Sequence, residues 1–286
     1  MIVGSDISQF QGSIDWDTYK NNSNFVIIRS TYGNGYYDSW FAHNRDEARR
    51  VGLPHGFYHF CYPQYNSPLD EAKWFCKALY DLQEGESLYL DWEETYSGDA
   101  VAWCKTFLDY VSANFNGIKP LIYLNQSYMS LDWSPVVNAG YGLWLASYQA
   151  DGMGNTGKWP SMALQQTSSS QQVPGIVGNV DRDVFFGDID QFKAYGYKKP
   201  VIVVNIPEPV VVPEPTQAPG EEPVNVVETP PTVTTEPPAP IPTVTSNTNS
   251  EPLPTVTSST NPLPKVTLWQ QIVNFFTNLW QTLTSK

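Results

Sequence analysis

The stretch SLYLDWEETY, residues 87–96, is apolar and aromatic as far as Leu90 and then becomes acidic. Side chains on a β-strand alternate between its two faces. One face of a strand here would carry Leu88, Leu90 and Trp92, and the other would carry Tyr89, Asp91 and Glu93. The apolar face suits contact with helices. The pattern therefore predicts a buried strand whose carboxylates lie at the inner, C-terminal mouth of a closed sheet, where barrels keep their active sites.

Short β-like runs alternate with amphipathic segments over the first 200 residues. The predicted strands are 2–6, 25–31, 56–62, 87–93, 120–124, 142–147, 162–166 and 180–186, and the predicted helices are 39–51, 67–82 and 98–115. Strands separated by helices indicate parallel pairing and βαβ units. Because helices become scarce after the fifth strand, we expect an α/β fold, a barrel with an incomplete ring of helices.

Composition divides the chain into three parts. Residues 201–264 contain 16 Pro and 7 Glu but no Lys, Arg, Trp, Tyr or Phe. Such a segment carries too little apolar bulk to offset the entropy of ordering it. We therefore expect a catalytic barrel over residues 1–195, a disordered Pro/Thr/Glu-rich linker over 196–264 and an amphipathic helix over 265–286.

The expected C-terminal helix has a long apolar stripe. The stripe consists of Leu268, Trp269, Ile272, Val273, Phe276, Leu279, Trp280 and Leu283. Its polar face has none of the Lys or Arg residues that a membrane-surface helix normally carries, and no stretch of the chain is apolar for long enough to span a bilayer. Self-association into a homo-oligomer is the favoured interpretation. Docking onto the barrel and membrane contact are the alternatives, and no stable membrane insertion is expected.

The charged and metal-binding residue types exclude several classes of function. A net charge of −13 without a basic stripe argues against nucleic acid as a partner. Cys61, Cys76 and Cys104 have no metal or redox spacing, so we expect buried free thiols. No His, Cys and carboxylate set has zinc spacing, and neither a metal nor a cofactor is expected. We expect His59 to be packed and hydrogen-bonded, and His43 to be a solvated helix residue.

More carboxylates fall at strand ends. Asp6 closes the run IVGSD, and Asp181 and Asp183 lie in NVDRDVF. Aromatic residues cluster at strand ends too, in FYHF (57–60), LIYLNQSY (121–128) and LWLASY (143–148). Two neighbouring carboxylates repel each other when both ionise, so one tends to keep its proton. A protonated acid beside an ionised partner can cleave a glycosidic bond. The alternatives are a solvated strand end, or a sugar-binding barrel without turnover.

Six motifs, in their order and spacing, make residues 1 to about 190 resemble the glycoside hydrolase family 25 lysozymes of bacteriophage endolysins and bacterial autolysins. The motifs are GSDISQFQGSIDW, GFYHFCYP, LYLDWEE, PLIYLNQSYM, LWLASY and GNVDRDVFFGD. The resemblance implies a (β/α)5(β)3 barrel, five strand–helix units followed by three strands. It also implies muramidase activity on bacterial peptidoglycan, cleaving the β-1,4 bond between N-acetylmuramic acid and N-acetylglucosamine, as in a phage endolysin that lyses its host.

The matching motifs imply roles for four carboxylates. Glu93 would be the general acid, Asp91 its partner, and Asp6 and Asp181 would complete an acidic floor. Because Asp91 and Glu93 are two residues apart on one strand, we favour a mechanism in which Asp91 orients the acetamido group of the substrate. Covalent attack by Asp91 is the alternative.

Five further residues are candidate sugar contacts: Tyr58, Tyr62, Tyr123, Trp144 and Gln165. Each aromatic residue among them is equally suited to core packing. Gln165 is chosen because the run LQQTSS replaces the Trp-Gln-Tyr run that family members often show, with Leu164 at the Trp position.

The first residues show no cationic start followed by an apolar run, so no secretory signal is expected. We therefore expect the protein to be made in the cytoplasm of the host bacterium and to act on the cell wall after its release.

Overall fold

A closed sheet forms the centre of the computed structural model, which describes residues 1–149 and 154–200. Within these residues the strand order is β1-β9-β8-β7-β6-β5-β4-β2-β3, and an additional β1–β2 pairing closes the barrel. The expected C-terminal helix and all but the first five residues of the expected linker lie outside the described residues. None of the described helices is long and apolar enough to cross a membrane.

Eight strands make the barrel, and the two-residue β3 is appended to its β2 edge. The strands are β1 (Ile2–Ile7), β2 (Phe25–Tyr32), β3 (Tyr36–Tyr37), β4 (His55–Phe60), β5 (Ser87–Asp91), β6 (Leu121–Asn125), β7 (Gly142–Ala146), β8 (Leu164–Gln171) and β9 (Val180–Phe185). The barrel strands β1, β2, β4, β5, β6, β7 and β8 pair in parallel with one another, whereas β9 is antiparallel to both β8 and β1 and β3 is antiparallel to β2. All eight predicted strands are present.

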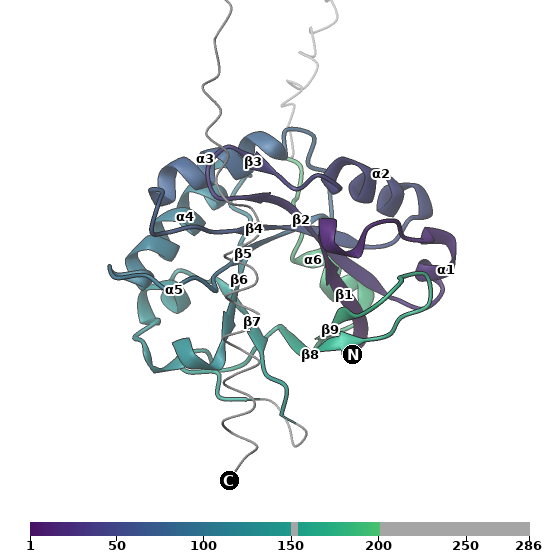
Figure 1. Ribbon diagram of the computed structural model, residues 1–286. Helices are drawn as coiled ribbons and strands as arrows, with labels where there is room; N and C mark the ends of the chain where they lie inside the picture. The colour runs from purple at the N-terminus through teal and green to yellow at the C-terminus, as the bar shows by residue number, and fades with distance from the viewer. Residues whose placement is uncertain (150–153, 201–286) are drawn as a thin grey trace, which may run out of the picture. The chain divides into compact units, whose positions relative to one another are not determined.

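Helices cover only part of the barrel. They are α1 (Trp16–Lys20), α2 (Phe41–Val51), α3 (Pro68–Ala78), α4 (Ala100–Asn114), α5 (Ser134–Asn138) and α6 (Ile189–Ala194), with 3₁₀ turns η1 (Gln9–Gln11) and η2 (Gln126–Ser130). One helix follows each of β1, β2, β4, β5 and β6 before the last three strands. Figure 1 shows α2 to α5 outside β2 to β7, while β8 and β9 lack such cover. The predicted (β/α)5(β)3 architecture is confirmed.

The start of α3 follows from its sequence. Ser67 is the N-cap, and its Oγ accepts a hydrogen bond from the Asp70 amide at 3.2 Å. Pro68 occupies the first helical position, where its missing N–H costs nothing, and Asp70 and Glu71 place negative charge in the first turn. These local preferences fix where the helix begins, and therefore how the chain leaves β4.

The two faces of β5 separate as its alternation predicts. Leu88, Leu90 and Trp92 are fully buried in the layer between the sheet and the helices. The Trp92 ring centroid lies 5.4 Å from that of Trp103 on α4. Tyr89, in contrast, joins the separate cluster inside the barrel. The strand itself ends at Asp91, but the Trp92 N–H still donates to the Tyr123 carbonyl at 3.1 Å, so the alternation continues to Glu93.

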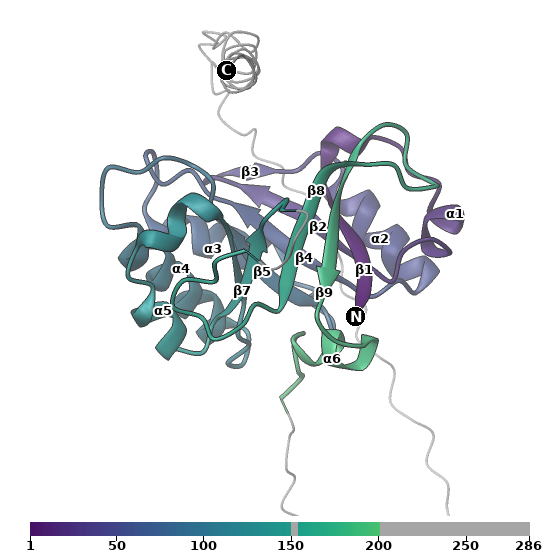
Figure 2. The same ribbon diagram turned by 90° about the horizontal axis from the view of Figure 1, so that it is seen from below.

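The end of the barrel opposite the C-terminal ends of the parallel strands is covered by α6, which the sequence did not predict. Figure 2 shows α6 beside the N-terminus and the start of β1. Phe192 is buried; its ring stacks on Phe25 at 4.6 Å and meets Phe185 edge-on at 5.4 Å. The folded unit continues past α6, since the Tyr197 N–H donates to the Glu86 carbonyl at 2.8 Å.

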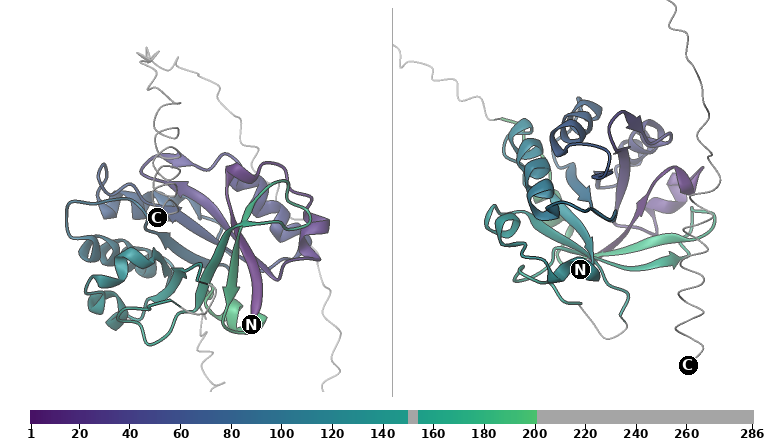
Figure 3. Two further views of the ribbon diagram at one scale, coloured as in Figure 1. Left: turned by 60° about the horizontal axis from the view of Figure 1, so that its bottom comes forward. Right: turned by 60° about the vertical axis from the view of Figure 1, so that its left-hand side comes forward.

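A long connection between β8 and β9 reaches back to the first helix, as Figure 3 shows. The Asp15 N–H donates to the Gly175 carbonyl at 2.9 Å. Gly175 has φ +99°, and a Cβ there would lie 2.6 Å from the Tyr19 backbone nitrogen. Only glycine therefore suits this close approach, which links the last strands to α1.

The thiols and imidazoles are as expected. All three cysteines are buried and unpaired. His59 is fully buried; its Nδ1 pairs with Thr31 Oγ1 at 2.7 Å and its Nε2 with Glu71 Oε2 at 2.8 Å. His43 on α2 is exposed. None of these groups faces the catalytic end of the barrel described below.

Replacing Phe192 by Ala should lower the free energy of unfolding by about 3–5 kcal/mol, because it removes a fully buried ring that closes the barrel end. Urea unfolding followed by tryptophan fluorescence measures this change. Tyr80→Ala is the control, since the Tyr80 side chain is 83% exposed. Equal unfolding midpoints for Phe192→Ala and the wild type would show that α6 does not close the barrel.

Candidate active site

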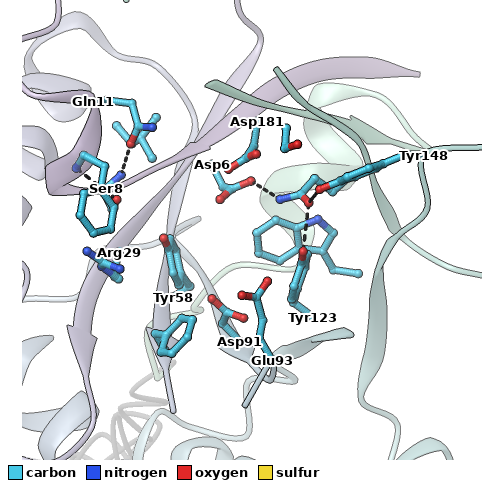
Figure 4. Close-up of a pocket in the computed structure, with 16 residues that line it drawn as sticks. Asp6, Ser8, Gln11, Arg29, Tyr58, Asp91, Glu93, Tyr123, Tyr148 and Asp181 are labelled. Atoms are coloured by element: carbon cyan, nitrogen blue, oxygen red, sulfur yellow. Dashed lines mark hydrogen bonds between the residues drawn. The ribbon is translucent and has the colours of Figure 1, made fainter. Parts of the chain in front are cut away.

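A cavity of about 320 Å³ opens at the C-terminal ends of the parallel strands. Its lining combines carboxylates, aromatic rings and one cation (Figure 4). The lining residues are Asp6, Ile7, Ser8, Phe10, Gln11, Arg29, Tyr58, Phe60, Asp91, Glu93, Tyr123, Trp144, Tyr148, Gln166, Ser169 and Asp181. All four carboxylates implied by the sequence motifs are therefore in one place.

The four carboxylates come from strands that are far apart in sequence. Asp6 lies on β1, Asp91 on β5 and Asp181 on β9, and Glu93 lies two residues beyond the end of β5. In Figure 4 Asp91 and Glu93 face Asp6 and Asp181 across the cavity. Glu93 therefore points into the cavity. The loop that carries it is held by Tyr128, whose hydroxyl donates to the Glu93 carbonyl at 3.2 Å.

Burial and mutual repulsion keep protons on these groups. Burial is the largest cause of the raised pKa of Asp91, followed by the charges of Glu93 and Asp6, while Arg29 opposes the shift. Glu93 is exposed at the cavity rim, but the surrounding protein atoms still reduce the hydration of its carboxyl group and raise its pKa. Burial, with the charge of Asp6, raises the pKa of Asp181 to about 9. The cavity therefore favours a carboxyl group that is protonated near neutral pH.

A glutamine that sequence analysis missed holds Asp6 in place. Gln166 Nε2 donates to Asp6 Oδ2 at 2.8 Å, and Gln166 Oε1 accepts hydrogen bonds from the hydroxyls of Tyr123 at 3.0 Å and Tyr148 at 2.6 Å. Gln165, the predicted sugar contact, lies outside the cavity, and its Nε2 donates to the Ser147 carbonyl at 2.8 Å. Alternation along β8 explains the correction, because Leu164 points inward and the next inward position is Gln166.

The predicted aromatic contacts divide into two groups. Tyr58, Tyr123 and Trp144 line the cavity. Tyr62 does not, because β4 ends at Phe60 and the inward alternation stops there. The Tyr62 N–H instead donates to the Glu71 carboxylate at 3.0 Å.

Asp183 is buried beneath the cavity and holds the cavity-lining residue Trp144 in place. The indole Nε1 of Trp144 donates to Asp183 Oδ1 at 2.8 Å. Burial raises the pKa of this carboxyl group to about 8. Asp183 has no surface exposure and does not line the cavity, so it positions Trp144 and adds to the electrostatic cost of ionising Asp6.

Arg29 supplies the only positive charge among the residues that line the cavity. Its Nε donates to Asp38 Oδ2 at 2.8 Å, and the same oxygen accepts the Gln9 N–H at 2.9 Å. This pairing fixes η1, which carries Phe10 on the rim of the cavity. Alternation along β2 places Arg29 on the same face as Ile27, which lies in the barrel interior. The strand pattern in the sequence could therefore have predicted that Arg29 points inward. In residues 1–149 and 154–200, no group of three or more His, Cys, Asp or Glu residues is arranged to hold a metal ion.

The sequence itself decides the family. Residues 5–176, more than half of the chain, match the profile of glycosyl hydrolases family 25. The chain belongs to this family.

Individual proteins and solved structures are also similar to this chain. The uncharacterized protein YegX of Escherichia coli O157:H7 is 30% identical over 203 residues, which cover 68% of this chain and 73% of that protein. A bacterial lysozyme from Streptomyces coelicolor has a similar structure, with a TM-score of 0.58 and 26% identity over 68% of this chain and 96% of its own. The catalytic domain of the endolysin ply40, from bacteriophage P40 of Listeria monocytogenes, has a TM-score of 0.54 and 27% identity over 68% and 97% of the two chains.

Family 25 membership and the similarity to lysozymes make this protein a glycosidase of the lysozyme type, a hydrolase of peptidoglycan. The expected enzyme class is therefore confirmed.

The stability of the family 25 barrel should depend on pH through Asp181. Its folded-state pKa is about 9, against about 3.9 for an unperturbed Asp. Between these values the folded state holds a proton that the unfolded chain releases, so this residue lowers the free energy of unfolding as the pH rises. The Tm of Asp181→Asn should exceed that of the wild type by a margin that grows from about pH 4 to about pH 9.

Thermal unfolding at several pH values measures this margin, and Asp190→Asn, at an exposed carboxyl on α6, is the control. A margin independent of pH would contradict the raised pKa.

Proposed function

We propose that this lysozyme is an N-acetylmuramidase, which hydrolyses the β-1,4 bond between N-acetylmuramic acid and N-acetylglucosamine with Glu93 as its general acid. The observation that carries the proposal is the position of Glu93, whose carboxyl group has a raised pKa, lies beside Asp91 and faces Asp6 and Asp181 across one cavity. A carboxyl group that is still protonated can donate to the glycosidic oxygen, which is how glycosidases make this oxygen a leaving group.

In the first step, Glu93 gives its proton to the glycosidic oxygen as the bond to C1 of N-acetylmuramic acid breaks. The acetamido oxygen of the same sugar bonds to C1, so the positive charge moves into an oxazolinium ring. The N-acetylglucosamine side then departs with the proton as a hydroxyl. In the second step, the Glu93 carboxylate takes a proton from water, the water oxygen attacks C1, and the ring opens. Glu93 recovers its proton, and a new reducing end is formed.

Asp91 suits the task of holding the acetamido group. Its carboxyl group is largely buried, and the residue lines the cavity beside Glu93. An acetamido N–H can donate to the part of this carboxyl group that reaches the cavity, which would orient the acetamido oxygen toward C1 and stabilise the cationic ring. A protein-bound glycosyl ester at Asp91, detected by mass spectrometry, would replace this assignment with covalent catalysis.

Replacing Glu93 by Gln should lower the rate of peptidoglycan hydrolysis by about two to four orders of magnitude, because the amide cannot donate a proton in this way. The rate is measured as new reducing ends released from purified Gram-positive walls, and mass spectrometry of the products identifies the reducing sugar. Glu84→Gln is the control, because Glu84 is exposed and lies outside the cavity.

Unchanged activity of Glu93→Gln would refute the assignment of the acid. A reducing N-acetylglucosamine end would refute the assignment of the bond. Tight wall binding without new reducing ends in the wild type would indicate a sugar-binding barrel.

The proposed biological role is host lysis by a bacteriophage, with the enzyme made in the host cytoplasm and acting on the wall after release. The similarity to the endolysin ply40 supports this role. Expression in a Gram-positive host should leave the culture turbid until its membrane is permeabilised, after which turbidity should fall. Glu93→Gln should leave the permeabilised culture turbid. Clearing without permeabilisation, or wild-type enzyme in the medium of intact cells, would contradict the release step.

A further inference from the structure

Beside the cavity, the short strand β3 displays aromatic rings that the mechanism does not use. Tyr36 and Tyr37 form this strand, and their side chains are 56% and 46% exposed. Exposed aromatic rings gathered in one place are uncommon in soluble proteins unless they bind something. The role of β3 therefore needs an explanation beyond the barrel, which closes without it.

The Tyr36 ring is held in a defined position. Tyr36 pairs with Tyr32 across the β2–β3 ladder, and the two rings stack with centroids 5.3 Å apart and planes 9° apart. The indole Nε1 of Trp74 on α3 donates to the Tyr36 carbonyl at 3.0 Å. Trp74 also packs against the Tyr37 ring, with centroids 4.7 Å apart. This support makes the exposed ring a preorganised surface, which reduces the entropy lost on binding.

Two series of side-chain contacts connect Tyr32, the ring that stacks on Tyr36, with residues that line the cavity. The guanidinium carbon of Arg29 lies 5.4 Å from the Tyr32 ring centroid and 5.1 Å from that of Phe10. On the other route, Tyr62 meets Tyr32 edge-on at 6.1 Å and Phe60 at 5.5 Å. Arg29, Phe10 and Phe60 all line the cavity. Figure 4 shows Arg29 and Tyr148 at opposite sides of the cavity, so the tyrosines of β2 and β3 extend the site on the Arg29 side.

The charges of the residues on the Arg29 side of the cavity indicate which kind of ligand binds there. The side chains of Tyr32, Tyr36 and Tyr62 are neutral, and the charge of Arg29 is matched by Asp38, which is buried beside it. Tyr32, Tyr36, Tyr62 and Arg29 thus include no unmatched cation that could bind the carboxylates of a peptide. Lys77 Nζ lies 5.2 Å from the centroid of the Trp74 ring, which packs against Tyr37 and not among these four residues. Flat rings with hydroxyl groups instead suit a pyranose, whose C–H face packs on an aromatic ring while its hydroxyls form hydrogen bonds.

From these contacts we infer that Tyr36, backed by Tyr32, binds a sugar of the glycan strand that lies beyond the sugars held in the cavity. The inference rests on the proposed function, because it assigns a more distant part of the same substrate. It implies that the enzyme acts better on long glycan strands than on short oligosaccharides. Tyr36 is thus a binding residue remote from the reacting atoms.

The test compares Tyr36→Ala with the wild type on two substrates, long peptide-free glycan strands and a tetrasaccharide of two disaccharide units. The ratio of kcat/KM on the strands to kcat/KM on the tetrasaccharide should fall by about threefold to tenfold, which corresponds to one aromatic stacking contact. The loss should lie mainly in KM. Tyr36→Trp, which keeps a flat ring, should preserve the ratio. Tyr80→Ala is the control, because it removes an exposed tyrosine outside this group.

An unchanged ratio for Tyr36→Ala, or equal losses on both substrates, would overturn the inference. So would a loss confined to strands that still carry their peptides, because the occupant would then be the peptide. Failure of the proposed function gives a different result, since Glu93→Gln would then remain active on the tetrasaccharide.

Discussion

Four carboxyl groups share one poorly hydrated cavity, and their repulsion is the constraint on which the chemistry of this enzyme depends. Parallel pairing places the ends of β1 and β5 at one mouth, and the antiparallel β9 brings Asp181 to the same place. Burial is the largest cause of the raised pKa of Asp6 and of Asp91, and the charges of neighbouring carboxyl groups raise both further. The cavity therefore retains protons that isolated carboxyl groups would release near neutral pH, and this retention disfavours the folded state.

The rest of the barrel compensates for that cost. The outward face of β5 packs Leu88, Leu90 and Trp92 against the helices, so the strand that carries the acids is anchored by apolar burial. Gln166 donates a hydrogen bond to Asp6, and Trp144 donates one to an oxygen of Asp183. At the other end, α6 inserts Phe192 between aromatic side chains of β2 and β9. The packing around the cavity thus holds the carboxyl groups close together despite their mutual repulsion.

Strong local patterns made much of this structure predictable. Alternation in β5 predicted both the apolar outer face and the inward carboxylates, and the N-cap signals of α3 predicted where it begins. The short helices α1, α5 and α6 were not predicted, because five or six residues carry too little periodicity to be recognised. The prediction for Tyr62 was wrong because β4 ends at Phe60, two residues before it. The prediction for Gln165 was wrong because the motif does not specify which face of β8 each glutamine occupies, whereas Leu164 points inward and alternation then makes Gln166 the inward residue. The contacts of Gln166 with Asp6, Tyr123 and Tyr148 depend on tertiary structure, which local sequence does not contain.

All three cysteines lie in the described barrel, buried and unpaired. Burial raises the pKa of Cys76 to about 12 and raises those of Cys61 and Cys104 well above the ordinary value, so reactive thiolate is scarce. The folded barrel therefore contains no covalent cross-link that a reductant could break. Its folded conformation is held by packing and hydrogen bonds alone, so exposure to a thiol reagent leaves it with no bond to lose.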